Sequence, residues 1–455
     1  MIDTNLEFCK NELIEVISLF DDVEKFSIRH RFSEIETKVT NTITLNGQTY
    51  AYGNLIRYSN DIEKKRLVKR YAKLSLYKAL SKNLNLNLPW GALTGIRPTK
   101  LAYQHISESG EFESFFVDTM KVSEEKTKLT RMVLDAQSGI YEKNDTNTDF
   151  FVFIPFCPSR CKYCSFISAD LKSSARYVDQ YVDTLVDEIK FSASFIKNLR
   201  SIYIGGGTPV SLSDENLEKI LFVIDKLNTG VEFTVEAGRP DCITESKLNL
   251  LKKYRVTRIC VNPQTFSDKT LELIGRNHTS LDVVEKYNIA KDMFDINMDL
   301  IAGLEGETID DFKQSIDKAI ELSPENITVH TLCIKRGSYL AEEEKRLSGK
   351  QVEQMVEYAK KSLIDAGYVP YYLYRQKYMA GNLENVGYTK KGKACVYNID
   401  VMEEISQNVA CGANAISKRV YNGGERIERV ASPKDIATYL NKIDKIKEEK
   451  AKLFS

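Results

Sequence analysis

The sequence predicts an α/β protein organised around an open barrel of parallel strands. From residue 149 to about residue 365, strand-like and helix-like segments alternate, with strand candidates that start near 150, 201, 231, 257, 296 and 326. Alternation of this kind predicts a parallel sheet with helices packed outside it. The active sites of such barrels lie at the carboxyl ends of the strands, and the unusual residues of this region fall there.

The leading region, residues 1–146, has a different pattern. Residues 6–20 carry apolar positions at helical spacing, and residues 23–57 alternate and are rich in Thr, Ile, Val and Tyr. Within the alternating stretch, Asn46-Gly47 predicts a hairpin turn. Residues 61–83 are typical of a long basic helix. We therefore expect an N-terminal α+β domain, whose role the sequence does not indicate.

A polar run at 143–148 has the composition of a linker between the leading region and the barrel. We place the barrel core at 147–365 and a C-terminal region at 366–455. This last region starts with a tyrosine-rich segment that predicts a packed strand, and it ends in a charged helix around 434–450.

Composition excludes several classes of function. The 455 residues include 64 Lys+Arg and 64 Asp+Glu, so the formal net charge is zero, which argues against a nucleic-acid-binding surface. No run of about 18 apolar residues predicts a membrane span, and the first residues lack the basic segment of a signal peptide. Nine cysteines in a chain of this size are not a disulfide framework. We expect a cytoplasmic protein with reduced thiols.

Three cysteines stand close together directly after the first predicted strand. Cys157, Cys161 and Cys164 form a C-x3-C-x2-C run after the apolar segment 151–154, so they lie on a loop at a strand's carboxyl end. Thiolates are soft ligands that suit zinc or iron–sulfur clusters. Structural zinc sites normally close with four ligands, and no fourth Cys or His follows nearby. Three thiolates would leave one iron of a four-iron cluster open; three unrelated buried thiols are the alternative.

Further candidate site residues follow the later strands. Gly205 to Pro209 (Gly-Gly-Gly-Thr-Pro) lets a backbone approach a ligand closely, although a tight strand-to-helix turn explains it too. Glu236 ends its strand, where it would bind an ammonium or hydroxyl group or be solvated. Gln264 and Arg276 come next, and Arg suits bidentate capture of a carboxylate. Asp299 lies inside an apolar strand, where a buried carboxylate must be hydrogen-bonded, so ligand contact is favoured.

As a set, these motifs resemble one enzyme family. The cysteine stretch is similar to that of radical S-adenosylmethionine (SAM) enzymes. Ile-Pro-Phe-Cys-x3-Cys-x-Tyr-Cys, Gly-Gly-Gly-Thr-Pro, Gln-Thr-Phe-x8-Gly-Arg-x-His and Asp-Leu-Ile-x-Gly-Leu together resemble the oxygen-independent coproporphyrinogen III oxidases. Residues 91–100 and 381–388 are similar to one branch, the HemZ-type coproporphyrinogen dehydrogenases. The resemblance implies a radical SAM partial (β/α)6 barrel with an N-terminal α+β domain and a C-terminal region that caps the barrel mouth.

The resemblance also implies cofactors and their ligands. Cys157, Cys161 and Cys164 would hold a [4Fe-4S] cluster, and SAM would be the second cofactor. At the amino end of the SAM methionine, the implied contacts are Gly206, Gly207 and Thr208. Other polar groups of the methionine would be contacted by Glu236 and Arg276. The ribose, or a second SAM, would be contacted by Gln264 and Asp299. Phe151, six residues before the first cysteine, is counted with them as a cofactor-binding position.

Three phenylalanines depart from the best-described branch of the family. Phe151, Phe153 and Phe166 stand where that branch has a tyrosine, a histidine and a further cysteine. None of these positions ligates the cluster, so cluster and SAM binding are expected to persist. The departures affect the substrate step or the handling of a second SAM.

The reaction that the resemblance implies is an oxygen-independent oxidative decarboxylation in porphyrin and haem biosynthesis. A flavodoxin or ferredoxin-type donor reduces the cluster, which splits SAM to methionine and a 5′-deoxyadenosyl radical. The radical removes a hydrogen from the β-carbon of a propionate of coproporphyrinogen III. Loss of carbon dioxide and one electron leaves a vinyl group, and two such steps give protoporphyrinogen IX.

Contacts to the substrate are less defined than those to the cofactors. Four propionates call for cationic partners, and the candidates, each of which is also an ordinary surface charge, are Arg97, Lys100, Arg375 and Lys377. His278 and His330 are more often structural residues than ligands. Two other functions stay open on the same core: a haem-binding chaperone, which also has Phe where Phe166 stands, and another radical SAM reaction on a tetrapyrrole.

Overall fold

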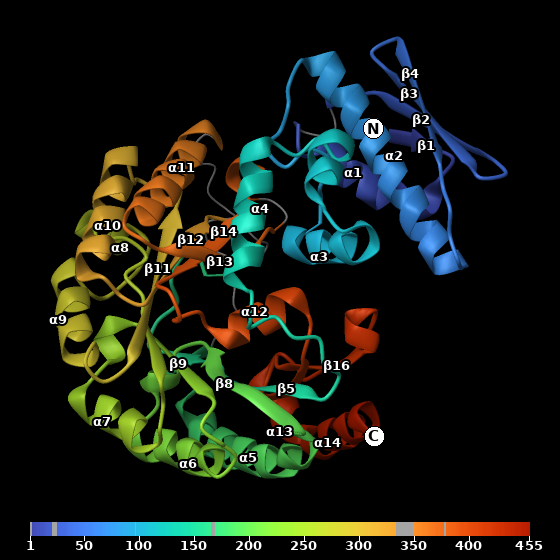
Figure 1. Ribbon diagram of the computed structural model, residues 1–455. Helices are drawn as coiled ribbons and strands as arrows, with labels where there is room; N and C mark the ends of the chain where they lie inside the picture. The colour runs from blue at the N-terminus through green and yellow to red at the C-terminus, as the bar shows by residue number, and fades with distance from the viewer. Residues whose placement is uncertain (1, 21–24, 96, 165–168, 334–348, 377–378) are drawn as a thin grey trace. The chain divides into compact units, whose positions relative to one another are not determined.

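The computed structural model of the protein (Figure 1) describes residues 2–20, 25–95, 97–164, 169–333, 349–376 and 379–455. Two residues singled out above, Phe166 and Lys377, lie outside the described residues. The chain divides into two compact units, Met1–Arg131 and Met132–Ser455. None of the helices in the described part of the chain has the length and apolar character needed to cross a membrane.

The first unit contains a four-stranded sheet in the order β1-β2-β3-β4. The hairpin predicted at Asn46-Gly47 is confirmed, since both residues have positive φ (52° and 78°) and Leu45 pairs with Gln48. Helix α2 packs on β3 and begins after Asn60, whose side chain accepts a hydrogen bond from the Glu63 amide. The elements are β1 (Ile2–Thr4), α1 (Lys10–Ile17), β2 (Ile28–Ile35), β3 (Lys38–Leu45), β4 (Gln48–Leu55), α2 (Asp61–Leu84), α3 (Pro98–Ser109) and α4 (Glu124–Ala136), which runs into the second unit.

The second unit contains the predicted parallel barrel. Six parallel strands lie side by side in the order β12-β11-β10-β9-β8-β5, and Figure 1 shows their helices around the outside. The sequence also predicts a capping box at the start of α10, from Thr308 and from Asp311 three residues further on. It is present, because Thr308 and Asp311 each accept a hydrogen bond from the other's backbone amide. The elements are β5 (Asn147–Ile154), α5 (Ala175–Ser192), β8 (Asn198–Gly206), α6 (Asp214–Asp225), β9 (Glu232–Gly238), α7 (Glu245–Lys253), β10 (Arg258–Val261), α8 (Asp268–Leu273), α9 (Ser280–Ala290), β11 (Asp295–Ala302), α10 (Ile309–Leu322), β12 (Asn326–Thr331) and α11 (Gly349–Asp365).

Residues after 365 extend this sheet at both edges. β14 pairs antiparallel with β12, and β13 pairs with β14, so the tyrosine-rich segment is a packed strand as predicted. At the other edge β15 pairs parallel with β5, and the hairpin β16–β17 follows. The elements are β13 (Val369–Tyr374), β14 (Asn385–Thr389), α12 (Val396–Glu403), β15 (Gln407–Cys411), β16 (Ile416–Tyr421), β17 (Arg426–Ala431), α13 (Ile436–Asn441) and α14 (Ile443–Phe454). β5 begins at Asn147, where we propose that the barrel region starts.

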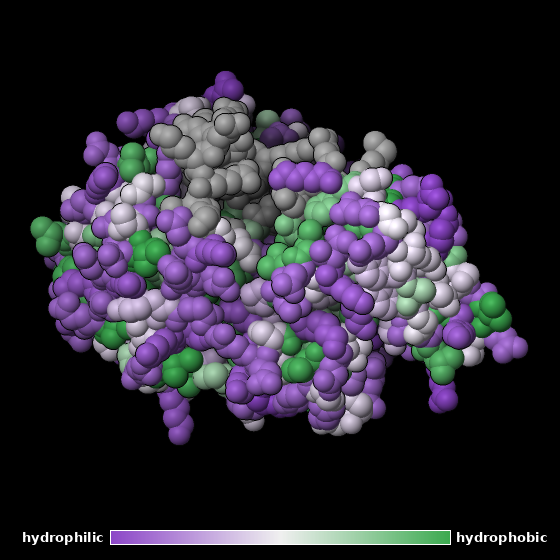
Figure 2. All heavy atoms as spheres, turned by 90° about the horizontal axis from the view of Figure 1, so that it is seen from above, coloured by the Kyte–Doolittle hydropathy of each residue, from purple (hydrophilic) through white to green (hydrophobic). Residues whose placement is uncertain are grey.

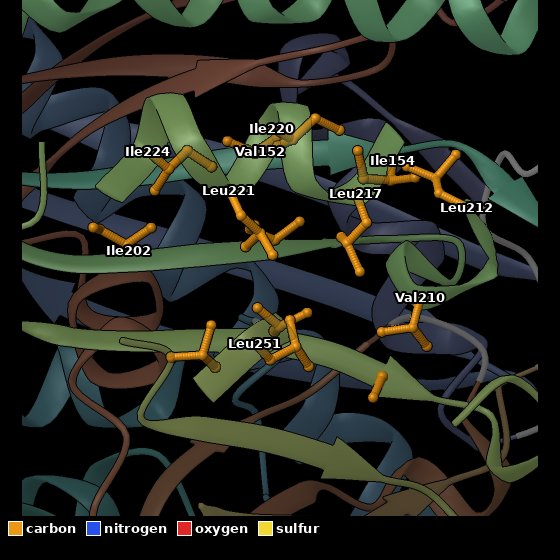
Figure 3. Close-up of a cluster of buried hydrophobic side chains, with 14 of the residues drawn as sticks. Val152, Ile154, Ile202, Val210, Leu212, Leu217, Ile220, Leu221, Ile224 and Leu251 are labelled. Carbon is orange, nitrogen blue, oxygen red and sulfur yellow. The ribbon is translucent and has the colours of Figure 1, made fainter. Parts of the chain in front are cut away.

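Apolar helix faces hold the strands in place. Figure 3 shows one such contact, in which side chains of α6 meet those of β5 and β8. The side chains drawn there are almost entirely shielded from solvent and include Val152, Ile154, Ile202, Leu217, Ile220, Leu221 and Ile224. Burying a side chain of this size contributes about 1.5–3 kcal/mol. The same packing fixes where the carboxyl ends of β5 and β8 lie.

The exposed apolar side chains of the described residues are dispersed over the surface. On the face shown in Figure 2, hydrophilic side chains predominate among the coloured residues, and hydrophobic ones are scattered. Ile62 and Leu281 are among the most exposed hydrophobic side chains, at 83% and 77%, and lie on different elements. Single exposed apolar side chains are normal. Dispersed side chains of this kind do not mark a binding site on the surface shown.

One buried ion pair ties α14 to α5. Lys450 Nζ lies 2.6 Å from Glu188 Oε1, and both side chains are almost fully buried (1% and 0% exposed). The other oxygen, Oε2, accepts hydrogen bonds from the Gly412 amide and the Tyr439 hydroxyl. Glu188 therefore connects α5, the end of β15, α13 and α14.

We expect Lys450→Ala to destabilise the protein by about 3–5 kcal/mol, because it leaves the Glu188 carboxylate buried without its cation. The matched control is Lys445→Ala on the same helix, whose pair with Glu449 is exposed (69% and 41%) and should contribute less than about 1 kcal/mol. Urea unfolding of the full chain, followed by circular dichroism, measures both. Equal shifts in the two variants would contradict this assignment.

Candidate functional site

A cavity of about 380 Å³ opens at the carboxyl ends of the parallel strands. Its lining comes from the segment after β5 and from the strands β8 to β12 with the segments that follow them. β13, β14 and α12 contribute most of the rest. All but one of the residues predicted to contact a cofactor line it. The exception is Phe151.

The cysteine loop forms one wall of the cavity. Cys157, Cys161 and Cys164 all line it; Cys161 is buried and the other two are half-buried. The loop is held by a short parallel pairing between β6 (Phe156–Cys157) and β7 (Ala169–Asp170). The Lys162 amide donates to the Ile274 carbonyl at 3.0 Å, which fastens the loop to the segment before Arg276. Three thiols on one wall of a ligand-sized cavity fit a cluster that keeps one metal open to a ligand.

Arg239, which the sequence reasoning missed, contacts this loop. Its Nη1 donates to the Ser159 carbonyl at 3.2 Å and to the Ser159 hydroxyl at 2.8 Å, and lies 4.0 Å from Cys161 Sγ. Nε and Nη2 donate to both carboxylate oxygens of Asp241. The side chain is only 4% exposed. A cation so placed holds the loop through Ser159 and adds positive charge beside Cys161. Its position shortly after Glu236, at a strand end, was the available signal.

The glycine motif packs directly against the cysteine segment. A Cβ atom on Gly207 would lie 2.5 Å from the Phe156 carbonyl oxygen and 3.0 Å from Cys157 Sγ. Gly206 has φ +116°, and its Cβ would lie 2.8 Å from the Ile154 carbonyl oxygen. The amides of Gly207 and Thr208 donate to the Ile154 and Phe156 carbonyls. Close backbone packing thus explains why glycine stands at both positions. The amides of Gly206 and Gly207 already donate to protein acceptors, so they are not available to a ligand.

Glu236 is part of the cavity wall and is not a solvated strand end. Its Oε1 accepts a hydrogen bond from the Tyr203 hydroxyl at 2.6 Å, and Oε2 accepts one from the Gly206 amide at 3.3 Å. Burial, only partly offset by the Tyr203 hydrogen bond, raises the pKa of Glu236 to about 7. The carboxyl group therefore exchanges its proton near neutral pH.

Asp299 is hydrogen-bonded inside the barrel, as predicted. Asn262 Nδ2 donates to its Oδ2 at 2.8 Å, and Asn297 Nδ2 donates to its Oδ1 at 2.8 Å. Burial opposes ionisation, but His330 and Asn297 outweigh it and hold the pKa of Asp299 below its ordinary value. Gln264 lies beside it with φ +67°, and its amide donates to the Asp299 carbonyl.

Two other predicted residues take different positions. Arg276 lines the cavity, and its Nη2 donates to the Asn262 carbonyl at 2.6 Å. Phe151 is not among the described residues that line the cavity. It pairs with Tyr203 across the sheet, and its ring packs on Tyr203 and Tyr397, with centroids 6.2 and 5.9 Å away. In this position it supports Tyr203, which donates to Glu236, and its contact with a cofactor stays a prediction.

The candidate substrate-binding residues differ in whether they line the cavity. His330 lines the cavity, whereas His278 does not, and burial lowers the pKa of His278 to about 4. Arg375 donates from Nη2 to the Asn382 carbonyl and side chain and is buried away from the cavity. Arg97 and Lys100 belong to the first compact unit.

The barrel and the three-cysteine loop define a protein of the radical SAM class, and residues 151–319 match the family model described as the radical SAM superfamily. A solved structure of the coproporphyrinogen III oxidase HemN from Escherichia coli, a radical SAM enzyme, has the same fold, with a TM-score of 0.54 and 20% identity over 70% of this chain and 72% of that one.

Sequence relatives narrow the class to a family. The oxygen-independent coproporphyrinogen-III oxidase-like protein HemZ of Bacillus subtilis (strain 168) is 36% identical over 421 residues, which cover 87% of this chain and 83% of that protein. The chain belongs to this family of oxygen-independent coproporphyrinogen-III oxidase-like proteins. The heme chaperone HemW of the same organism is 36% identical over 193 residues, covering 41% of this chain and 50% of that protein.

We expect Glu236→Gln to flatten the pH dependence of stability. In the unfolded chain the carboxyl ionises near pH 4.5, whereas in the folded protein its pKa is about 7. Because the folded pKa is raised, its contribution to stability is complete below pH 4.5 and is lost as the pH rises through 7. From pH 5 to 8 the wild type should lose about 1–3 kcal/mol relative to the variant.

Urea unfolding of the ligand-free protein at several pH values measures this difference. Glu321→Gln, on the exposed side of α10 (68% exposed), is the control and should follow the wild type. Parallel curves for wild type and Glu236→Gln would show that Glu236 ionises normally.

Proposed function

We propose that this protein is a radical SAM enzyme that converts coproporphyrinogen III to protoporphyrinogen IX by oxidative decarboxylation of two propionates without oxygen. The observation that carries the proposal is the similarity to the oxidase-like HemZ protein along 87% of the chain. One cavity that unites the cysteines, Glu236 and Asp299 supports it. We further propose a flavodoxin or ferredoxin-type electron donor and a cytoplasmic location.

In this proposal Cys157, Cys161 and Cys164 hold a [4Fe-4S] cluster. The donor set fits, because three soft thiolates face one cavity and leave one iron for another ligand. With both cofactors bound, the reduced cluster and SAM supply the 5′-deoxyadenosyl radical that removes hydrogen from the substrate. Arg239 keeps the loop in place and adds positive charge beside Cys161.

The remaining cavity residues bind and orient SAM. Glu236 and the Thr208 hydroxyl offer acceptors for the ammonium group of the methionine moiety. Arg276 offers donors for its carboxylate, and its Nε makes no hydrogen bond within the described residues. Asp299, which stays ionised, and the side-chain oxygen of Gln264 accept hydrogen bonds from the ribose hydroxyls. Each of these side chains lines the cavity, so one bound molecule could contact them together.

Hydrogen removal at a propionate carbon and departure of carbon dioxide need no proton donor at that carbon. The protein's task is therefore to orient the substrate and exclude water from the radical. Tyr203, Tyr372 and Tyr374 line the cavity, and their rings would shield part of a bound ligand from water.

Haem binding is the second candidate function, and the similarity to HemW favours it. That match covers half of the chaperone, whereas the match to HemZ covers most of both chains. Both the HemZ protein and the HemW chaperone are similar to this chain. The two functions must therefore be distinguished by measuring the reaction.

The test uses anaerobically reconstituted full-length protein with SAM, a reductant and coproporphyrinogen III. We expect protoporphyrin after oxidation, with about two 5′-deoxyadenosines per product, both measured by chromatography. Cys161→Ala should abolish both products, whereas Cys9→Ala, a buried cysteine of the first unit, should leave them unchanged.

Other outcomes separate the alternatives. Formation of 5′-deoxyadenosine without decarboxylation would retain the radical chemistry and reject this substrate. No SAM cleavage by protein with an intact cluster, together with stoichiometric binding of haem, would overturn the enzyme assignment in favour of a chaperone.

A further inference from the structure

The wall of the cavity formed by β12 and β13 holds an unusual row of polar side chains. His330, on β12, lies between Asp299 on β11 and Tyr374 on β13: its Nε2 is 3.8 Å from Asp299 Oδ1, and its Nδ1 is 3.3 Å from the Tyr374 hydroxyl. All three line the cavity. In the sheet, β12 is separated from β5, which carries the cysteine loop, by β11, β10, β9 and β8.

The carboxylate at one end of this row is fixed. Asn262 and Asn297 donate to its two oxygens, and Asn297 is itself held by the Thr328 hydroxyl, which contacts the Tyr372 hydroxyl at 3.2 Å. Asp299 is thus an anchored negative charge that faces His330. Such a charge fixes the orientation of the facing imidazole and pairs with it when the ring carries a second proton.

The phenol at the other end of the row is a donor. When the ring is protonated, both of its nitrogens carry N–H groups, so Nδ1 then donates to the Tyr374 oxygen and leaves the phenolic O–H for another acceptor. Burial raises the pKa of Tyr374 well above its ordinary value, so the hydroxyl keeps its proton at neutral pH. A charged donor behind a phenol strengthens the hydrogen bond that the phenol makes.

The wall has one further property that selects its ligand. Among the described lining residues contributed by β12, β13 and β14, His330 is the one that can carry positive charge; the others are neutral, such as Thr328, Tyr372 and Asn385. The arginines that line the cavity, Arg160, Arg239 and Arg276, lie in the segments after β5, β9 and β10. A ligand group accepting from Tyr374 and attracted by His330 is an anion that can accept hydrogen bonds.

We propose that His330 and Tyr374 form the subsite that binds the carboxylate of a substrate propionate, with Asp299 as the positioning residue behind the imidazole. This inference rests on the proposed function, which provides a substrate with four propionates. It places one propionate at the β12–β13 wall and leaves the arginines near the cysteine loop for SAM and for a second propionate. A carboxylate of SAM is the other source of the same chemistry, and the experiment separates the two.

The experiment compares His330→Gln, which removes the charge, and Tyr374→Phe, which removes only the hydroxyl, in the reconstituted full chain. Three quantities are measured: the dissociation constant of coproporphyrin III, the stable oxidised tetracarboxylate, by fluorescence; the dissociation constant of SAM; and the KM and kcat for coproporphyrinogen III. We expect each variant to weaken coproporphyrin binding and raise KM about ten-fold. Tyr374→Phe, which keeps the contact between His330 and Asp299, should change SAM affinity and SAM cleavage without substrate less than about two-fold.

Two matched controls keep general damage apart from loss of the subsite. His105→Gln and Tyr358→Phe carry the same substitutions on α3 and α11, outside the residues that line the cavity, and should leave all three quantities unchanged. Circular dichroism and iron content check that each variant folds and holds its cluster.

The outcomes are distinct. Weaker SAM binding with unchanged coproporphyrin binding would assign the subsite to SAM and overturn the proposal. No change in either ligand would show that the row is structural. If the wild type binds coproporphyrin III through His330 and Tyr374 but forms no protoporphyrinogen, the subsite stands and the proposed reaction fails.

Discussion

The candidate site depends on one close backbone approach. The end of β8 and the segment after β5 lie so near each other that Gly207 would place a Cβ atom 2.5 Å from the Phe156 carbonyl oxygen. Two amide–carbonyl hydrogen bonds, from Gly207 to Ile154 and from Thr208 to Phe156, fasten the contact. Because the cysteine loop begins at Cys157, the strand pairing of the barrel core directly sets the loop's position, and any larger residue at Gly207 would push the loop away from the cavity.

The two carboxyl groups of the cavity differ because their surroundings differ. Glu236 faces a tyrosine hydroxyl and a weak backbone donor, so burial dominates and raises its pKa to about 7. Asp299 receives two amide donors and faces an imidazole, so its pKa is lowered despite burial. Environments that push two pKa values apart commonly separate the roles of two acids. Here they give one carboxyl that stays charged and one whose charge follows pH near neutrality.

Local patterns predicted much of this architecture. The strand–helix alternation, the Asn46-Gly47 turn and the capping box at Thr308 are encoded by neighbouring residues, and the structure confirms all three. The cavity positions of the cysteines, Glu236 and Asp299 follow from their places at or near the strand ends. The cofactor contact expected of Phe151 rested on its distance in sequence from the first cysteine, which does not encode its packing on Tyr203 and Tyr397.

Contacts between distant segments had no comparable signal. Tyr374 meets His330 only because β13 and β12 both pair with β14, and the sequence around either residue does not encode that pairing. Arg239 is similar, since its partner Ser159 lies two strands away along the sheet. The parallel pairing of β15 with β5 joins segments near the two ends of the second unit. Such pairings are selected by burial over the whole sheet, which local propensity does not report.

The same wall bears on the choice between a decarboxylase and a haem-binding protein. Similarity covers the chaperone and the oxidase-like protein alike, so groups that would meet a tetrapyrrole are the place to look for a difference. An imidazole that ligates haem iron needs a nitrogen lone pair directed at the metal. Both ring nitrogens of His330 instead face protein partners, Asp299 and Tyr374, so neither lone pair is directed into the cavity. The arrangement therefore opposes iron ligation by His330. A propionate subsite would suit coproporphyrinogen and haem alike, since both carry propionates, so the absence of an imidazole ligand among the described residues of this wall is the feature that argues against haem binding through His330.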